Sequence, residues 1–349
     1  MRLWPRKREP NDSKIQVGIL GAAGIAGQQL VVLLEGHPWF ELTWLGATEA
    51  FRGKPYGDLP WLLAGKAPER AANLRVETCK PQGAPHLVFS ALDAAVAGQV
   101  EKAFAAQGHC VFSNALDLRR DPLVPLLVPD VNAQHLDLVR AQQRTRWRGA
   151  LVAAPSWSTV LLSIVLAALC EFEIKRVMLT AMVDAAAMTD EELEMEEERI
   201  ETEVRKVLGR MEGDSIKAHP VSASAQVSTR ETHSGQTDLV SLEFARRVPI
   251  EQIGEAFRGF SSVPQALQLP SAPAKPIVFH DEGRRFDSGL NSAAPGHRMT
   301  VHVERLRRCP VLDCKFAVHG SNGMLGEATT SILNAELMVA RALYAPIVT

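Results

Sequence analysis

The feature that most constrains the fold is a glycine-rich turn near the start of the chain. The apolar run I-Q-V-G-I-L at 15–20 is followed by G-A-A-G-I-A-G and then by the helix-compatible Q-Q-L-V-V-L-L-E-G. Gly21, Gly24 and Gly27 permit a sharp turn and let backbone N–H groups approach a phosphate closely at the helix start. A glycine motif alone also fits a simple tight turn. Its place between a strand and a helix favours a dinucleotide-binding turn.

The segments that follow predict two kinds of domain. Strand-like runs alternate with helix-like ones up to about residue 152, which predicts an α/β domain with a Rossmann-like, doubly wound parallel sheet. Beyond that point β-like runs predominate, which predicts a C-terminal α+β domain with a mostly antiparallel sheet. We therefore expect a basic leader at 1–14, the first domain at 15–152, the second at 153–324, and a C-terminal helix at 325–345 that packs back on the first.

Composition narrows the class of protein. The chain has 349 residues, 46% of them hydrophobic, and a formal net charge of -2, which gives no basic field for nucleic acid or a membrane surface. Its start lacks the apolar run of a signal peptide, so we expect a cytoplasmic protein. Five cysteines without a C-x-x-C pair indicate neither a disulfide framework nor a metal site. A small-molecule ligand is the expected partner.

The end of the second predicted strand bears on the choice of cofactor. Ala47-Thr48 stands where an acidic residue would bind a ribose, although Glu49 is close enough to substitute for it. Arg52 and Lys54 follow, and a 2′-phosphate needs cations and hydroxyl groups. The pattern favours NADP over NAD.

Several ordered stretches resemble one enzyme family. V-G-I-L-G-A-A-G-I-A-G, V-F-S-N-A, D-P-L-V-P-L-L-V-P-D-V-N, E-E-E-R-I-E-T-E and S-I-L-N-A-E-L make the chain similar to aspartate-semialdehyde dehydrogenases of the archaeal and fungal type. The resemblance implies a homodimer or homotetramer with an NADP-binding domain and a catalytic and dimerisation domain. It also implies reduction of aspartyl phosphate through a cysteine thioester, with a histidine as acid and base and an arginine on the substrate carboxylate.

The chain departs from the family at the residues that carry this chemistry. The family's cysteine falls on Trp157 and its histidine on Gln236, while His233 lies close by in the sequence. Neither indole nor amide can replace a thiolate or a proton-shuttling imidazole near neutral pH. Arg230 is an imperfect replacement for the substrate arginine.

Other positions match the family and remain candidates for binding. The candidates for substrate or anion binding are Asn114, Arg119, Glu196, Arg199 and Arg230, of which Glu196 and Arg199 could equally form a surface pair. The candidates for cofactor binding are Gly21, Ala23, Gly24, Ile25, Gly27, Thr48, Arg52, Ser90, Asn322 and Gly326.

Two main hypotheses follow for the function. One is a repurposed oxidoreductase that transfers hydride directly to or from a small carbonyl or imine of amino-acid type, with His233, Asp184 or Asp238 as proton source and Trp157 as a wall of the pocket. The alternative is a catalytically dead paralogue that acts as a partner, regulator or ligand-binding protein. An active semialdehyde dehydrogenase using Cys170 is disfavoured, since we expect that thiol to be buried in the core.

Overall fold

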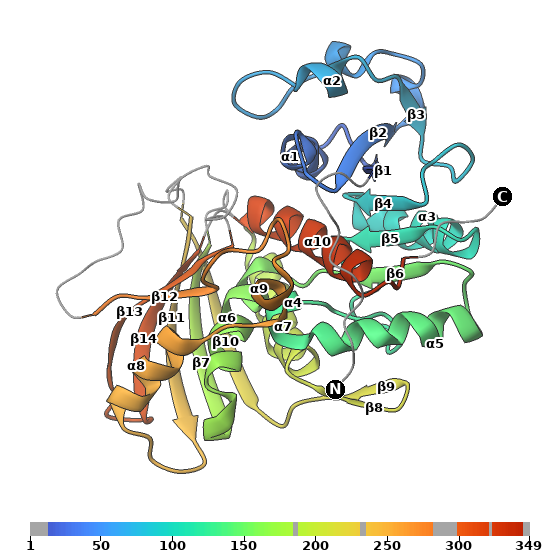
Figure 1. Cartoon of the computed structure of the whole chain (residues 1–349). Coiled ribbons are helices and arrows are strands. Elements are labelled where there is room, and N and C mark those ends of the chain that lie inside the picture. Colours follow the sequence, from blue (N-terminus) through green and yellow to red (C-terminus); the bar gives the residue numbers. More distant parts are fainter. Residues whose placement is uncertain (1–12, 184–187, 231–234, 282–298, 321–322, 345–349) are drawn as a thin grey trace.

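A computed structural model describes residues 13–183, 188–230, 235–281, 299–320 and 323–344. Two six-stranded sheets lie in different parts of the molecule, with helices between them (Figure 1). The α/β fold class predicted from the sequence is confirmed. None of the described helices is both long and apolar enough to cross a bilayer.

The first sheet is parallel throughout and has the strand order β3-β2-β1-β4-β5-β6. Its order reverses between β1 and β4, which places a crevice at the carboxyl ends of these two strands, where open α/β sheets bind ligands. Its strands are β1 (Ile15–Leu20), β2 (Phe40–Ala47), β3 (Val76–Thr78), β4 (Leu87–Ser90), β5 (Cys110–Ser113) and β6 (Ala150–Ala153).

Short helices connect these strands and cover the sheet (Figure 1). Helix α1 follows the glycine turn directly, and α3 joins β4 to β5. These helices are α1 (Ile25–Leu34), α2 (Glu69–Ala72), α3 (Ala94–Ala106), α4 (Pro129–Asn132) and α5 (Leu138–Thr145).

The second sheet has the order β10-β7-β11-β14-β13-β12 and is mixed, with more antiparallel than parallel pairs. The pairs β10·β7 and β12·β13 are parallel, and the other three pairs are antiparallel. The parallel pair β10·β7 arises because a long helix crosses over between these two strands. The strands are β7 (Ile174–Val183), β10 (Ser222–Thr229), β11 (Gln236–Phe244), β12 (Ile277–Phe279), β13 (Val301–Arg308) and β14 (Cys314–Gly320), with a separate hairpin of β8 (Arg210–Glu212) and β9 (Ser215–Lys217).

Helix α6 (Trp157–Ala168) is the central helix of the molecule. Its residues from Trp157 to Leu166 are all buried, as expected for a helix that is apolar on every side. It contacts α7 (Asp190–Val207), α10 (Gly323–Ala340) and the second sheet. The N-terminus of α6 therefore lies where both domains meet. Two further helices, α8 (Ile250–Gly259) and α9 (Val263–Leu267), complete the second part of the chain.

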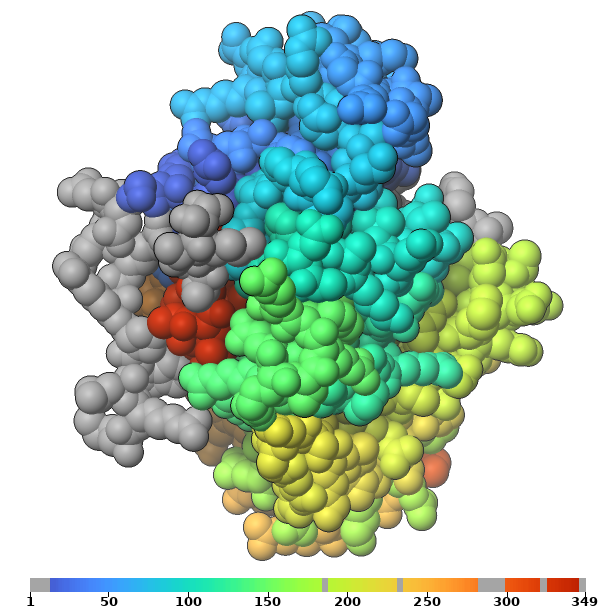
Figure 2. Space-filling model, turned by 90° about the vertical axis from the view of Figure 1, so that its right-hand side faces the viewer, coloured from blue at the N-terminus to red at the C-terminus, as the bar shows by residue number. Residues whose placement is uncertain are grey.

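Helix α10 returns to the first sheet and packs against α1 and β5. It ends at Ala340, earlier than the predicted 345, and Ala342 has a left-handed backbone with φ of 51°. Arg341 then donates hydrogen bonds to the Asp137 carboxylate at 3.0 Å and the Ala133 carbonyl at 2.8 Å. In Figure 2 the C-terminal part of the described chain, coloured red, lies at the surface beside a segment from the middle of the chain, coloured green.

Candidate functional site

The three glycines of the turn have different reasons to be glycine. Gly21 has φ of +78°, and a Cβ on it would lie 2.5 Å from the Ala91 carbonyl oxygen. A Cβ on Gly27 would lie 2.2 Å from the Gly21 carbonyl oxygen, so the turn itself needs both glycines. Gly24 is exposed, has an ordinary extended backbone with φ of -79°, and would place its Cβ no closer than 3.7 Å to its nearest neighbour.

Gly24 therefore has no packing reason to be glycine. It is the N-cap of α1, and its lack of a side chain leaves the first N–H groups of that helix open to a ligand. Ala23 is partly exposed and Ile25 is 41% exposed beside it. An exposed, uncapped helix start of this kind fits a pyrophosphate.

The remaining candidates for cofactor binding lie at different depths. Thr48 is exposed, and Arg52 pairs with Glu49 at 3.4 Å, with both side chains largely in solvent. Ser90, at the end of β4, is fully buried. Asn322 lies outside the described residues.

Ser90 lies beside a buried carboxyl group instead of facing open solvent. Burial raises the pKa of Glu101 to about 7, against the opposing effect of the Ser90 and Ser113 hydroxyls. The Ser113 hydroxyl donates to Glu101 at 2.7 Å and accepts a hydrogen bond from the Ala115 N–H. This buried polar group fixes the carboxyl end of β5, from which the next candidate residues extend.

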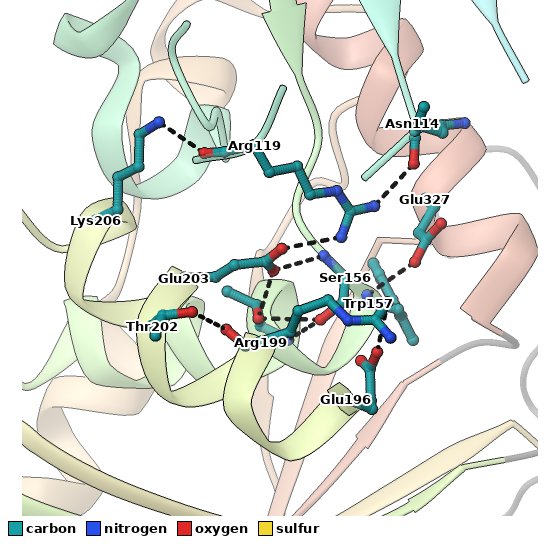
Figure 3. Close-up of polar contacts among 12 residues, drawn as sticks. Asn114, Arg119, Ser156, Trp157, Glu196, Arg199, Thr202, Glu203, Lys206 and Glu327 are labelled. Carbon is teal, nitrogen blue, oxygen red and sulfur yellow. Dashed lines mark hydrogen bonds and ion pairs between the residues drawn. The ribbon is translucent and has the colours of Figure 1, made fainter. Parts of the chain in front are cut away.

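Arg119 is the centre of the candidate anion site (Figure 3). Its side chain is 4% exposed, and it donates to Glu203 at 3.0 Å and to the Asn114 carbonyl at 2.9 Å. Within the described residues its Nε has no hydrogen-bond partner. The Asn114 side-chain oxygen accepts a hydrogen bond from Ser331 on α10. Two of the five N–H donors of Arg119 are therefore already used within the protein.

Glu196 and Arg199 form an ion pair of 3.0 Å on one face of α7. Their side chains are only 15% and 23% exposed, so the pair is not a solvated surface contact. Burial raises the pKa of Glu196, and the nearby Arg199 opposes that rise. A hollow of about 390 Å³ lies alongside, lined by Leu116, Arg119, Arg120, Met195, Glu198, Arg199, Thr202 and Glu203.

The start of α6 is surrounded by carboxylates. The N–H of Ser156 donates to Glu203 at 3.0 Å, and the Thr159 hydroxyl donates to the same carboxylate at 3.0 Å. The N–H of Trp157 donates to Glu327 of α10 at 3.3 Å (Figure 3). Burial raises the pKa of Glu327 to about 7, although the nearby charge of Arg119 opposes the shift.

Trp157 is a buried wall of the site, with 2% of its surface exposed. Its indole ring lies against Gly326, where a Cβ would come within 2.3 Å of the ring. The glycine at 326 therefore has a packing reason, which the sequence did not indicate. Cys170 cannot replace the missing thiol here, because it lies beyond the far end of α6, about 18 Å along a helix of 12 residues. The expectation that Cys170 is buried was wrong, since it is exposed.

Gln236 lies on β11 with 3% exposure. Its amide nitrogen donates to the Ser158 hydroxyl at 2.8 Å and to Asp238 at 2.7 Å. Burial raises the pKa of Asp238 to about 7, and the second oxygen of Asp238 has no partner within the described residues. Asp238 is thus a carboxyl group in direct contact with Gln236 that can hold a proton near neutral pH.

The other expected polar residues of this region are His233, Asp184 and Arg230. His233 and Asp184 lie outside the described residues. Arg230 is exposed, and its backbone N–H donates to the Val183 carbonyl at 2.9 Å.

Sequence reasoning missed two carboxylates of the site. Glu203 lies seven residues after Glu196 and four after Arg199, so helical spacing could have placed it on the same face. Glu327 had no comparable signal, because only the packing of α10 against α6 brings it to Trp157.

A Rossmann-type sheet with a glycine turn at its first strand, joined to a mixed-sheet domain, defines a two-domain protein of the NAD(P)-binding dehydrogenase class. Residues 16–139 match the family model described as Semialdehyde dehydrogenase, NAD binding domain. The chain is 37% identical to the aspartate-semialdehyde dehydrogenase of Methanothermobacter thermautotrophicus, over 93% of this chain and 99% of that protein. It is 34% identical to that of Archaeoglobus fulgidus, over 93% and 98%.

The solved structures agree with these relatives. The aspartate-semialdehyde dehydrogenase of Candida albicans, solved with NADP, superposes with a TM-score of 0.86 at 31% identity, over 95% of this chain and 100% of that one. This chain belongs to the aspartate-semialdehyde dehydrogenase family. The family resemblance inferred from the sequence is confirmed.

Proposed function

We propose that this chain binds NADP(H) at its glycine turn and transfers hydride directly to or from a small carbonyl or imine, with no thioester intermediate. The main support for nucleotide binding is the glycine at position 24, because neither backbone strain nor packing requires a glycine there. Family membership and the NADP complex of the Candida albicans relative support the same proposal.

The residues present fit a dinucleotide. The open N–H groups at the start of α1 would hold its pyrophosphate, and Thr48 with Arg52 would face a 2′-phosphate from the exposed segment that follows β2. When bound, the cofactor supplies the hydride.

The chain's own residues must then orient the ligand and hold a proton. Trp157 has no nucleophilic lone pair like a thiolate, and the Gln236 amide does not exchange protons near neutral pH. Asp238 is buried beside Gln236 with its pKa raised to about 7, which suits a group that keeps or releases a proton at that pH. Asp238 is therefore the proposed proton reservoir.

A second candidate function is a catalytically silent nucleotide-binding paralogue that regulates a protein partner. It is favoured by the burial of Trp157 and Gln236, which leaves 2% and 3% of these side chains exposed at the positions of the family's thiol and imidazole. Assembly as a homodimer or homotetramer and a cytoplasmic location belong to both proposals.

The deciding experiment is a fluorescence titration of the purified chain with NADPH and with NADH. Gly24→Ala adds one methyl group without a steric clash, so we expect an unchanged melting temperature but NADPH binding weakened by about tenfold or more, because the methyl blocks the helix start. Gly259→Ala is the matched control, since its Cβ meets nothing within 4 Å and it lies on α8.

Either of two results would count against nucleotide binding. One is the absence of saturable binding at millimolar NADPH, and the other is equal affinity in Gly24→Ala and Gly259→Ala. If NADPH binds, turnover with simple aldehydes, ketones and imines separates the oxidoreductase from the silent paralogue.

A further inference from the structure

The N-terminus of α6 already contains two carboxylates of the protein itself. Glu203 reaches it from α7 and Glu327 reaches it from α10 (Figure 3). Free N–H groups at the start of a helix of this length attract anions, and the helix dipole adds to that attraction. Here Ser156 and Trp157 donate to side chains where an external phosphate or carboxylate would otherwise be held.

The two carboxylates are held very differently. Glu203 accepts from Arg119, the Ser156 N–H and the Thr159 hydroxyl, each at 3.0 Å, so it is a fixed part of the structure. Within the described part of the chain, Glu327 accepts one hydrogen bond, from the Trp157 backbone N–H at 3.3 Å. Glu327 is the more easily displaced of the two.

The surroundings of Glu327 would suit an anion if its own charge were absent. Arg119 lies close enough to stabilise a negative charge there, and its buried Nε has no partner among the described residues. Glu196 and Glu203 oppose a second negative charge, while Arg199 neutralises Glu196. A negative charge at position 327 therefore opposes the binding of an anion beside it.

We propose that Glu327 is a specificity-determining residue, which occupies the anion position at the start of α6 and so excludes ligands that would place a phosphate or carboxylate there. The ligand of this site is then neutral or positively charged at the end that faces Trp157. This inference deepens the proposed hydride transfer to a carbonyl or imine and rests on that function for its biological meaning.

Sulfate binding to the full chain tests the inference without any cofactor. Sulfate keeps both charges between pH 6 and 8, unlike phosphate, so its own ionisation does not interfere. In Glu327→Gln and Glu327→Ala we expect calorimetry to show sulfate bound at least about tenfold more tightly than in the wild type, because a like charge a few ångströms away is removed. Glu336→Gln is the control, since it removes a different carboxylate of α10, which is buried and pairs with His37.

The pH dependence supplies a second readout. Wild-type affinity for sulfate should rise as pH falls from 8 to 6, because Glu327 takes up a proton with its pKa of about 7. Glu327→Gln should lose most of that dependence. Since Glu196 also has a raised pKa, a small residual slope is expected.

Several outcomes would overturn the inference. Sulfate affinities that are equal in the wild type and in Glu327→Gln, or an equal gain in Glu336→Gln, would do so. Should both Glu327 variants fail to fold, a wild-type affinity independent of pH would overturn it and a rise at low pH would support it. Failure of NADPH binding together with the expected sulfate gain would reject the proposed function and leave the role of Glu327 intact.

Discussion

At the scale of single residues, Trp157 replaces more than a thiol. Its indole ring lies against the backbone of Gly326, and the backbone N–H of Trp157 donates a hydrogen bond to the next residue, Glu327. The large side chain of Trp157 at the start of α6 thus packs against Gly326 of α10, which has no side chain. The three residues form one packing unit that joins the two helices.

This packing predicts a strong coupling between positions 157 and 326. Gly326→Ala should lower the free energy of unfolding by about 1–3 kcal/mol, because its methyl group would overlap the indole ring. In a Trp157→Ala background the same change should cost much less, since the ring is gone. Urea denaturation of the four proteins measures the coupling, and additive costs would contradict the contact.

At the scale of elements, the acidic helix α7 does more than present charge to solvent. Its Glu197 and Glu201 carboxylates accept hydrogen bonds from the backbone N–H groups of Val227 and Ala225, at 2.8 and 2.9 Å. Both N–H groups belong to β10, an edge strand that pairs with β7 on one side only. The helix therefore closes an edge that would otherwise be open to another strand.

Removing these acceptors should expose the edge of β10. We expect Glu197→Met with Glu201→Met to lower the unfolding free energy by about 1–3 kcal/mol per lost acceptor and to raise aggregation on storage. Glu197→Gln with Glu201→Gln keeps the acceptors and serves as the control. Urea denaturation and light scattering measure the two effects, and identical behaviour of both double variants would show that the capping is unimportant.

At the scale of the whole molecule, buried acids should control how stability depends on pH. Burial raises the pKa of Glu101, Asp238 and Glu327 to about 7, from ordinary values of 4.5, 3.8 and 4.5. The folded chain thus binds more protons than the unfolded chain between these values, and stability falls as pH rises through that window. His135, with its pKa lowered to about 4, acts in the opposite sense but only up to its ordinary value of 6.5.

We therefore expect the free energy of unfolding to decrease from pH 5.5 to pH 8. Urea denaturation at several pH values measures the slope, and Asp238→Asn should make it shallower because one titrating group is removed. A stability that is flat or rising over this range would contradict the burial of these three acids.

Local sequence determined much of the fold and the family. The glycine turn, the alternation of strands and helices, and the ordered stretches shared with the family are properties of neighbouring residues, so they can be read without a structure. The same reading identified Trp157 and Gln236 as departures from the family's chemistry. The boundaries at 15–152 and 153–324 stay predictions.

Tertiary structure decided what those departures do. Only the packing of α10 and α7 against α6 brings Glu327 and Glu203 to the helix start, across 170 and 47 residues of sequence. Likewise, only the space around each glycine separates Gly24 from Gly21 and Gly27, which look alike in the motif. Sequence spacing reports contacts within one helix or strand, whereas burial, pKa and steric room depend on which distant segments meet.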